Sequence, residues 1–234
     1  EYLDNLESEN NPDEWQAFTN ALTTNLTSFF REEHHFPILA KHLVQISKPI
    51  KIWCSAASTG EEPYTIAMTA CEAFGTLKRP VEIIATDIDT NVLAIASKGV
   101  YPYERVSKLS EKQRKEFFQR GAGAQEGSVR VRSELRNLIS FQPLNLLEPQ
   151  WTLKEPFDVI FCRNVMIYFD KPTQAKILSR FVPLMKPNAL LFAGHSENFL
   201  YISKDLHLRG KTVYELKQGN STKQNIANIR GEHA

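Results

Sequence analysis

Polar side chains follow four apolar segments that have the composition of β-strands. They lie at Ser55 to Glu62, at Asp87, at Asn145 with Leu146, and at Arg163 with Asn164, with Tyr168 a few residues further on. In open α/β sheets, ligands bind at the carboxyl ends of the strands, near the point where the strand order reverses. We therefore expect these groups to surround one ligand.

The turn after the first of these strands combines small residues with two acids. Ser58 and Gly60 would let a ligand approach the backbone at the start of a helix, but the dinucleotide pattern G-x-G-x-x-G is absent. Glu61 and Glu62 occupy the helix start, where they would repel a pyrophosphate and accept a neutral or cationic ligand. The turn favours a nucleoside without phosphates over a nicotinamide dinucleotide.

Asp87 ends the second strand, 27 residues after Gly60, and is suited to accept hydrogen bonds from ribose hydroxyls. The alternative is that Asp87 or Asp89 only caps the next helix. Acidic, amide and hydroxyl groups at successive strand ends together suit an adenosyl ligand that carries a sulfonium. S-adenosylmethionine is the natural candidate.

Strands and helices alternate along most of the chain, which predicts a mostly parallel α/β sheet. We expect strands at 50–54, 81–85, 138–142, 157–162 and 189–193, and a closing hairpin that includes 213–216 as an antiparallel edge. We expect helices at 12–22, 32–46, 90–98 and 171–184, and a further helix from Glu61. The spacing of Thr59 and Glu62 predicts a capping box, and Asp170 is the expected N-cap of the helix at 171–184.

A basic insert at about 101–136 interrupts this alternation. Nine Lys or Arg and five acids fall within 103–136, around a short helix, a glycine-rich turn at 121–127 and an alternating strand at 129–132. We interpret it as a small antiparallel β subdomain attached to the main sheet. Residues 218–234 are expected to be a disordered polar tail.

Composition excludes several classes of protein. The 234 residues carry a net charge of +1, so no global field favours nucleic acid. Three scattered cysteines form neither a disulfide framework nor a zinc motif, and they suit a reducing cytoplasm. No apolar run is long enough to span a membrane, and the acidic start is unlike a signal peptide. We expect a cytoplasmic monomer, without membrane insertion, cut from a longer chain because it begins at Glu1.

Four stretches resemble the CheR family of bacterial chemotaxis receptor methyltransferases, which methylate receptor glutamates. They are NALTTNLTSFFRE at 20–32, SAASTGEEPY at 55–64, ATDID at 85–89 and FDVIFCRNVMIYF at 157–169. The resemblance covers about 12–216 and implies a Rossmann-like S-adenosylmethionine methyltransferase fold. It implies a methyltransferase domain at 23–217, which carries the β subdomain, and residues 1–22 as the C-terminal edge of an N-terminal helical domain or linker. It places the cofactor contacts on Asn25, Thr27, Arg31, Glu62, Asp87, Asn145, Leu146, Arg163 and Asn164.

The residues themselves are consistent with roles in such a reaction. Asp87 suits the ribose, Glu62 the amino group of the cofactor, and Asn145 with Leu146 the adenine. Arg31 and Tyr168 are expected beside the transferred methyl group as catalytic residues that position the incoming carboxylate. A glutamate is already ionised at neutral pH, because its ordinary pKa is about 4.3. We therefore expect catalysis by positioning, without a proton relay.

The resemblance also implies that the β subdomain grips an acidic-aromatic peptide at the receptor C-terminus. Arg120, Gly121, Gly123 and Arg130 are the expected contacts, and the peptide would add a strand to the sheet. Such a tether raises the local concentration of enzyme at the receptor without taking part in the chemistry. The alternative is that the basic residues only form a solvated face.

Other readings stay open at this level. The chain could be a carboxyl methyltransferase for another protein, or a non-catalytic scaffold that senses the cofactor. His195 is more simply a hydrogen-bonded organiser of its loop than a catalyst. His34 and His35 are adjacent and cannot chelate from one helical face, so no metal site is expected.

Overall fold

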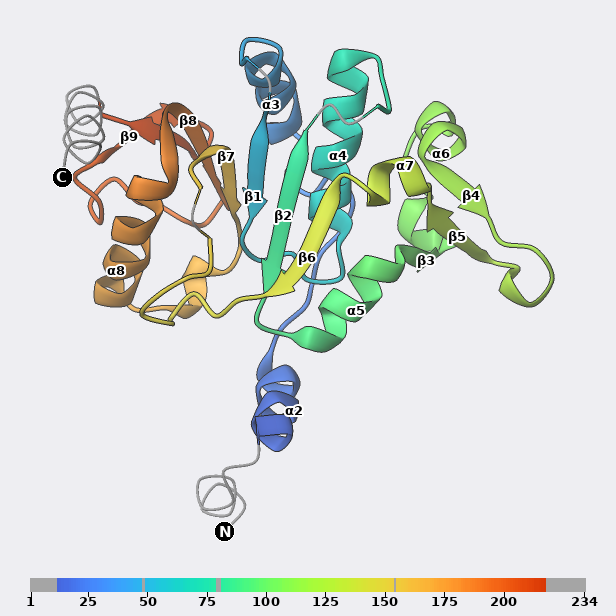
Figure 1. Ribbon diagram of the computed structural model, residues 1–234, viewed down its shortest axis with the longest axis horizontal. Coiled ribbons are helices and arrows are strands. Elements are labelled where there is room, and N and C mark those ends of the chain that lie inside the picture. The colour runs from blue at the N-terminus through green and yellow to red at the C-terminus, as the bar shows by residue number, and fades with distance from the viewer. Residues whose placement is uncertain (1–11, 48, 79–80, 154, 218–234) are drawn as a thin grey trace, which may run out of the picture.

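A computed structural model describes residues 12–217, except 48, 79, 80 and 154. A seven-stranded sheet forms the centre of the molecule (Figure 1). Its strands are β1 (Lys51–Cys54), β2 (Glu82–Asp87), β6 (Ile139–Pro143), β7 (Phe157–Cys162), β8 (Met185–Ala193), β9 (Leu206–Gly210) and β10 (Val213–Leu216). The main helices are α2 (Pro12–Leu22), α3 (His35–Leu43), α4 (Glu61–Phe74), α5 (Thr90–Lys98) and α8 (Lys171–Phe181).

The strand order β6-β2-β1-β7-β8-β10-β9 is that of a doubly wound sheet. The chain winds outward from β1 through β2 to β6, and then returns to the other side of β1 at β7. All of these pairings are parallel, whereas β10 runs antiparallel to both β8 and β9. This confirms the mostly parallel sheet with an antiparallel edge. The order reverses between β1 and β7, so the ligand site is expected at their carboxyl ends.

The two faces of the sheet bury separate apolar clusters. Successive side chains of a strand point to opposite faces, so Ile52 and Cys54 join one cluster while Trp53 joins the other. Helices α3 and α4 cover the first face, and α8 covers the second. All six residues of β7 are buried, as expected of a central parallel strand covered on both sides.

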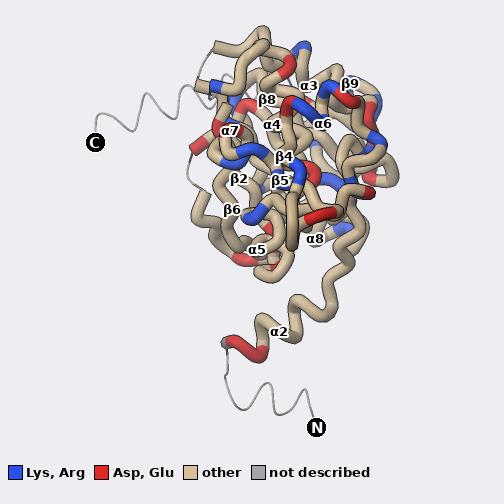
Figure 2. Tube along the Cα trace, turned by 90° about the vertical axis from the view of Figure 1, so that its right-hand side faces the viewer, with Lys and Arg blue, Asp and Glu red and all other residues tan. Residues whose placement is uncertain are grey.

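The insert forms a three-stranded antiparallel sheet in the order β3-β5-β4, which confirms the β subdomain. Its elements are β3 (Val100–Pro102), η1 (Tyr103–Val106), α6 (Glu111–Phe117), β4 (Phe118–Arg120), η2 (Gly123–Gln125), β5 (Ser128–Val131) and α7 (Ser133–Arg136). It lies at the α4 and α5 side of the molecule, opposite α8 (Figure 1). Lys and Arg lie along β4 and β5 on its outer surface (Figure 2).

Several predicted boundaries differ from those observed. The helix predicted at 32–46 begins at His35 and ends at Leu43, because positive φ angles at Phe30 and Glu32 keep the preceding turn irregular. Asp170 does cap α8, but that helix ends at Phe181 and continues as the 3₁₀ turn η4 (Val182–Leu184), which contains a proline.

The predicted capping box of α4 is wrong. Its N-cap is Gly60, in the left-handed region at φ 99°, without a side-chain cap. The Thr59 hydroxyl donates instead to the Glu61 carboxylate at 2.6 Å. A Cβ at Gly60 would come within 2.8 Å of Cβ of Ala96, so the close approach of α5 as well as the φ angle requires glycine.

The predicted tail at 218–234 and the first half of the predicted N-terminal segment lie outside the described residues. Within the described part, α2 contacts the sheet domain through Gln16, which donates to the carbonyl of Ile88 at 3.0 Å. Across the residues that the structure describes, every helix is too short or too polar to cross a lipid bilayer.

Candidate active site

A cavity of about 330 Å³ opens at the carboxyl ends of β1, β2, β6 and β7, where the strand order reverses. All ten residues that the sequence assigned to the cofactor or to catalysis line it: Asn25, Thr27, Arg31, Glu62, Asp87, Asn145, Leu146, Arg163, Asn164 and Tyr168. Its size lies at the lower end of the range for small-molecule sites. The structure therefore brings these residues together from segments spread over more than half of the chain.

Two neighbouring acids at the end of β2 have different tasks. Asp89 is the N-cap of α5 and accepts from the amides of Asn91 and Val92. Asp87 is not a cap: it accepts from the amides of Ser58 and Asp89 at 2.8 and 3.0 Å and faces the cavity. Burial raises the pKa of the Asp87 carboxyl, and these amide hydrogen bonds oppose the rise. The capping alternative thus applies to Asp89 alone.

Glu62 and Arg163 form a buried ion pair in the floor of the cavity. Nη1 of Arg163 lies 2.5 Å from Oε2 of Glu62, and its side chain is only 1% exposed. Nη2 of the same guanidinium lies 3.2 Å from Oε2 of Glu32 and donates to the carbonyl of Arg31. Burial raises the pKa of Glu62, and the charge of Arg163 offsets this only in part.

The second oxygen of Glu62 has only a weak partner, the thiol of Cys54 at 3.3 Å. Burial would also raise the pKa of Glu32, but the charge of Arg163 and hydrogen bonds from His195 and Asn164 outweigh it and lower the pKa. Of these two acids, Glu62 lines the cavity whereas Glu32 does not, and Glu62 also has the weaker donor, a thiol, on one of its oxygens.

The loop at 23–31 forms one wall of the cavity and contributes Asn25, Thr27 and Arg31. Arg31 donates to the carbonyl of Leu26 in its own loop at 2.7 Å, and among the described residues it forms no ion pair. Tyr168, on η3 (Met166–Tyr168), is 61% exposed at the rim. The cavity thus has a guanidinium without a carboxylate partner and an exposed hydroxyl, beside an anionic floor.

Asn145 and Leu146 lie in the loop after β6. Oδ1 of Asn145 accepts from the amide of Leu147 at 2.9 Å, which holds the loop in a tight turn, and Leu146 is buried. Asn164 has a positive φ of 58°, and its amide side chain donates to Glu32 at 3.2 Å. These residues have positions fixed by the protein before any ligand enters.

Sequence reasoning missed the buried Glu197. Its carboxylate accepts from the backbone amides of Asn164, Val165, Met166 and Gly194, and so joins the loops after β7 and β8. Burial raises the pKa of Glu197 even though these hydrogen bonds oppose the rise. The only sequence signal was an acid in a loop that directly follows a core strand.

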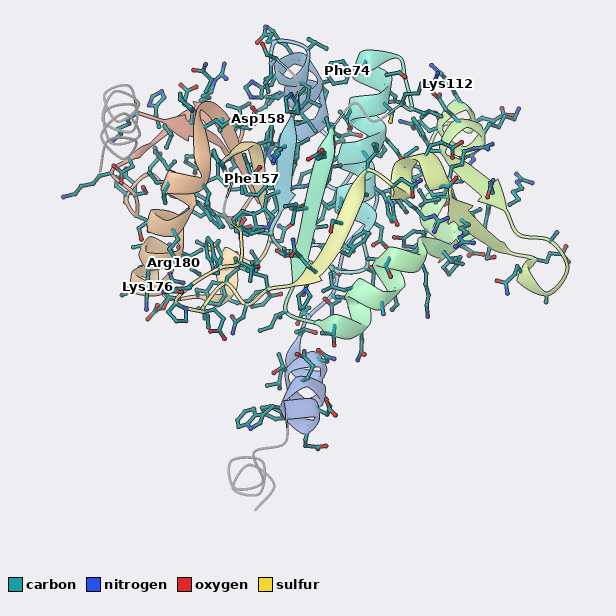
Figure 3. The ribbon with its side chains drawn as sticks, in the orientation of Figure 1. Phe74, Lys112, Phe157, Asp158, Lys176 and Arg180 are labelled. Atoms are coloured by element: carbon teal, nitrogen blue, oxygen red, sulfur yellow. The ribbon has the colours of Figure 1, made fainter. Side chains whose placement is uncertain are left out.

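His195 does not have the predicted organising role. Its ring is exposed and outside the cavity lining, and its backbone amide donates to Glu32 at 3.1 Å. Glu197, two residues on, organises the loop instead. A buried acid at the other end of the sheet, Asp158 on β7, binds the amide of Lys51 and the ammonium of Lys186 and is remote from this chemistry (Figure 3).

The ligand atoms of Glu32, His34 and His35 lie within 4.8 Å of one another, which the sequence argument against chelation did not foresee. Burial lowers the pKa of His35 to about 4, so its ring is neutral, and Nε2 donates to the carbonyl of Lys211 at 2.8 Å. The carboxylate of Glu32 already has Arg163 as its cationic partner. The expected absence of a metal stays a prediction.

The sheet order and the cavity at its reversal define a Rossmann-like domain that binds a nucleoside-type ligand, and the acids in its floor suit a ligand with an ammonium group. Residues 25–214 match the model of the family described as CheR methyltransferase, SAM binding domain. This chain belongs to that family, and its cofactor is S-adenosylmethionine.

Curated relatives agree with this assignment. The chain is 58% identical over 216 residues to a chemotaxis protein methyltransferase of Klebsiella aerogenes, covering 92% of this chain and 74% of the relative. It is 56% identical over 217 residues to the chemotaxis protein methyltransferase of Escherichia coli K12, covering 93% and 76%. Among solved structures, a TehB-like SAM-dependent methyltransferase from Corynebacterium glutamicum aligns at a TM-score of 0.45 and 11% identity, covering 90% of this chain and 96% of that one, and the assignment does not rest on it.

The residues present fit this cofactor. Asp87 and Glu62 offer acceptors for hydroxyl and ammonium groups, and Leu146 offers an apolar surface. The helix N-terminus beside the cavity carries Glu61 and Glu62 rather than a glycine-rich phosphate loop. The site is therefore suited to a cationic nucleoside without phosphates.

Proposed function

We propose that this domain methylates glutamate side chains of chemotaxis receptors and forms their methyl esters. The observation that carries the proposal is the Arg31 guanidinium: it lines the same cavity as the acids Glu62 and Asp87, which suit a cationic cofactor, and it forms no ion pair with any described residue. An unpaired guanidinium favours a substrate that brings its own carboxylate. The names of the curated relatives supply the chemotaxis setting.

S-adenosylmethionine, when bound, supplies a methyl group on a cationic sulfur. We propose that Asp87 accepts hydrogen bonds from the ribose hydroxyls and that Glu62 pairs with the amino group. Asn145 and Leu146 flank the adenine. The remaining contacts in this proposal are Asn25, Thr27, Arg31, Arg163 and Asn164.

In this proposal Arg31 and Tyr168 hold and orient the substrate carboxylate beside the cofactor. The bound cofactor would supply its methyl group to a carboxylate oxygen and would be left as neutral-sulfur S-adenosylhomocysteine, and no proton would have to move. Because the carboxylate is already ionised at neutral pH, the protein needs no general base and acts by orientation and exclusion of water.

We also propose that the β subdomain tethers a receptor peptide through Arg120, Gly121, Gly123 and Arg130. β4 and β3 are the outer strands of this sheet, so an added strand has an edge to pair with. Arg120, at the end of β4, lies over the ring of Tyr103 at 5.3 Å and is exposed. At Gly121 a Cβ would lie 1.9 Å from the carbonyl oxygen of Gln125, so the turn beside this edge requires glycine.

The catalytic unit in this proposal is the single domain at 23–217, which acts as a monomer in the cytoplasm. Residues 1–22 would belong to the edge of a helical domain that helps to dock the receptor. Gel filtration with light scattering tests the monomer directly.

Calorimetric titration with S-adenosylhomocysteine, followed by methyl transfer to isolated receptor, tests the main proposal. We expect Asp87→Ala to abolish binding. We expect Arg31→Met to lower kcat about 100-fold, because a misplaced reacting group costs about that factor, while binding changes less. If the chain binds S-adenosylhomocysteine but methylates no receptor, the alternative of a non-catalytic scaffold that senses the cofactor would hold instead. A folded chain that does not bind would overturn the proposal.

A further inference from the structure

Arg105, on η1 of the β subdomain, contacts two parts of the active-site wall. Its Nη2 donates to the carbonyl of Thr27 at 3.0 Å and forms an ion pair with Oε1 of Glu61. The Glu61 side chain is fully buried, whereas that of Arg105 is 40% exposed. Arg105 itself does not line the cavity. It therefore joins the loop at 23–31 to the first turn of α4 from outside.

Aromatic packing joins the same two parts. Phe29 packs edge-on against Tyr101 of β3 and Phe118 of β4, with ring centroids 5.2 and 5.6 Å apart. The hydroxyl of Tyr101 donates to the carbonyl of Thr59 at 2.7 Å, just before α4. The β subdomain thus supports the cavity wall at Thr27, Phe29 and Thr59.

The loop at 23–31 needs this support because it has little regular structure. Residues 23–28 belong to no helix or strand, and Leu26 is largely exposed. Separate contacts set its position. The side-chain amide of Asn25 donates to the carboxylate of Asp89, and the backbone amide of Phe30 donates to the hydroxyl of Thr65. Arg105 is the contact at Thr27, between these two, and it is the one of the three whose donor is a guanidinium.

We propose that Arg105 is a positioning residue for methyl transfer. Its guanidinium bridges the carbonyl of Thr27 and the carboxylate of Glu61, and so fixes the loop that carries Thr27 and Arg31. The proposal rests on the roles proposed above for this loop: the effect on cofactor affinity comes through Thr27 and Arg31, and the effect on the substrate carboxylate comes through Arg31. The β subdomain is then part of the active-site support as well as a docking module.

Three variants separate positioning from folding. Arg105→Met removes the contact but leaves the Glu61 charge buried, which also lowers Tm. Arg105→Met with Glu61→Gln removes that buried charge. Lys112→Met removes a charge from the exposed side of α6 in the same subdomain and is the matched control (Figure 3). For each we would measure Tm, the Kd of S-adenosylhomocysteine, and KM and kcat for methyl transfer.

We expect Arg105→Met to raise the Kd and the KM for S-adenosylmethionine about fivefold, within the range for loss of a charge-assisted hydrogen bond. The double variant regains most of the Tm but keeps the weak affinity, and Lys112→Met matches wild type. Arg105→Lys keeps a positively charged donor, so its Kd and KM should lie between those of wild type and of Arg105→Met.

Wild-type affinity in Arg105→Met would overturn the proposal. So would a double variant that regains Tm and affinity together, since the effect would then come only from the buried charge of Glu61. If the wild type binds S-adenosylhomocysteine but methylates no receptor, the proposed function fails, and the comparison of Kd values still decides the role of Arg105.

Discussion

Glu61 and Glu62 are adjacent at the start of α4, yet they face different parts of the molecule. Glu61 turns toward the β subdomain, where Arg105 and the Thr59 hydroxyl occupy its two oxygens. Glu62 lines the cavity; Arg163 pairs with one of its oxygens, and among the described residues the thiol of Cys54 is the partner of the other. A carboxylate held on both oxygens away from the cavity supports structure, whereas one that lines the cavity and has a weak donor on one oxygen can bind a ligand.

Among the variants that test this comparison, we expect the largest loss of stability from Arg163→Met. Arg163 pairs with both Glu62 and Glu32, so its removal leaves two carboxylates without a lysine or arginine partner among the described residues. We expect the free energy of unfolding to fall by about 3–5 kcal/mol, measured by urea denaturation, as for other broken buried pairs. Arg209→Met, which removes an exposed pair with Glu215, should cost less than about 1 kcal/mol. Equal losses in both variants would contradict the special position of Arg163.

Glu62→Gln and Glu61→Gln sharpen the comparison directly. We expect Glu62→Gln to raise the Kd of S-adenosylhomocysteine about tenfold with little change in Tm, because a charge-assisted contact to the ligand is lost while Glu32 still neutralises Arg163. Glu61→Gln should do the reverse, lowering Tm while the Kd stays within about twofold. Calorimetry and thermal melts on the same samples measure both. One common pattern for the two variants would show that facing the cavity does not matter.

The smallest effect that we expect is a dependence of the cofactor affinity on pH. Burial raises the pKa of Glu62 and Asp87, so on acidification both take up a proton at a higher pH than ordinary carboxyls do. A protonated Glu62 cannot pair with an ammonium group, so affinity for S-adenosylhomocysteine falls as pH drops through the raised pKa. Titrations from pH 7 downward measure this, and Glu62→Gln should remove part of the slope.

The stability of the ligand-free protein depends on pH with the opposite sign. Because the folded pKa of Glu62 exceeds its unfolded value, its contribution to the free energy of unfolding is fully present below about pH 4.5 and is lost as pH rises through the folded pKa.

For the affinity, the contradicting outcome is a flat pH profile. A wild-type Kd of S-adenosylhomocysteine that does not change with pH would show that neither Glu62 nor Asp87 touches the ligand.

Elements with strong local signals were predictable. The helix at 90–98 is observed with those boundaries, since Asp89 caps its start and Gly99 takes the left-handed conformation at its end. The strand at 157–162 is also confirmed, because a continuous apolar run suits a strand buried on both faces. The capping box failed because Glu62 finds Arg163, 101 residues away, and a spacing rule cannot see such a partner.

The strand ends predicted which residues meet, because the carboxyl ends of parallel strands share one edge of a sheet. They did not predict how those residues pair. Glu32 and Glu197 escaped notice since most of their partners, Gly194 excepted, come from loops more than 30 residues away in sequence. The contact of Arg105 with Thr27 spans 78 residues and follows from the packing of the insert, which periodicity does not encode.

Glu197 has a consequence for which nucleotides the domain admits. Four convergent backbone amides at the ends of two strands are the kind of nest that captures phosphate in other nucleotide-binding proteins. Here the nest holds the protein's own carboxylate, hydrogen-bonded to all four amides. An anion approaching the loop after β7 meets an occupied and negatively charged nest. A phosphate therefore cannot use these four amides, because the Glu197 carboxylate already accepts from all of them.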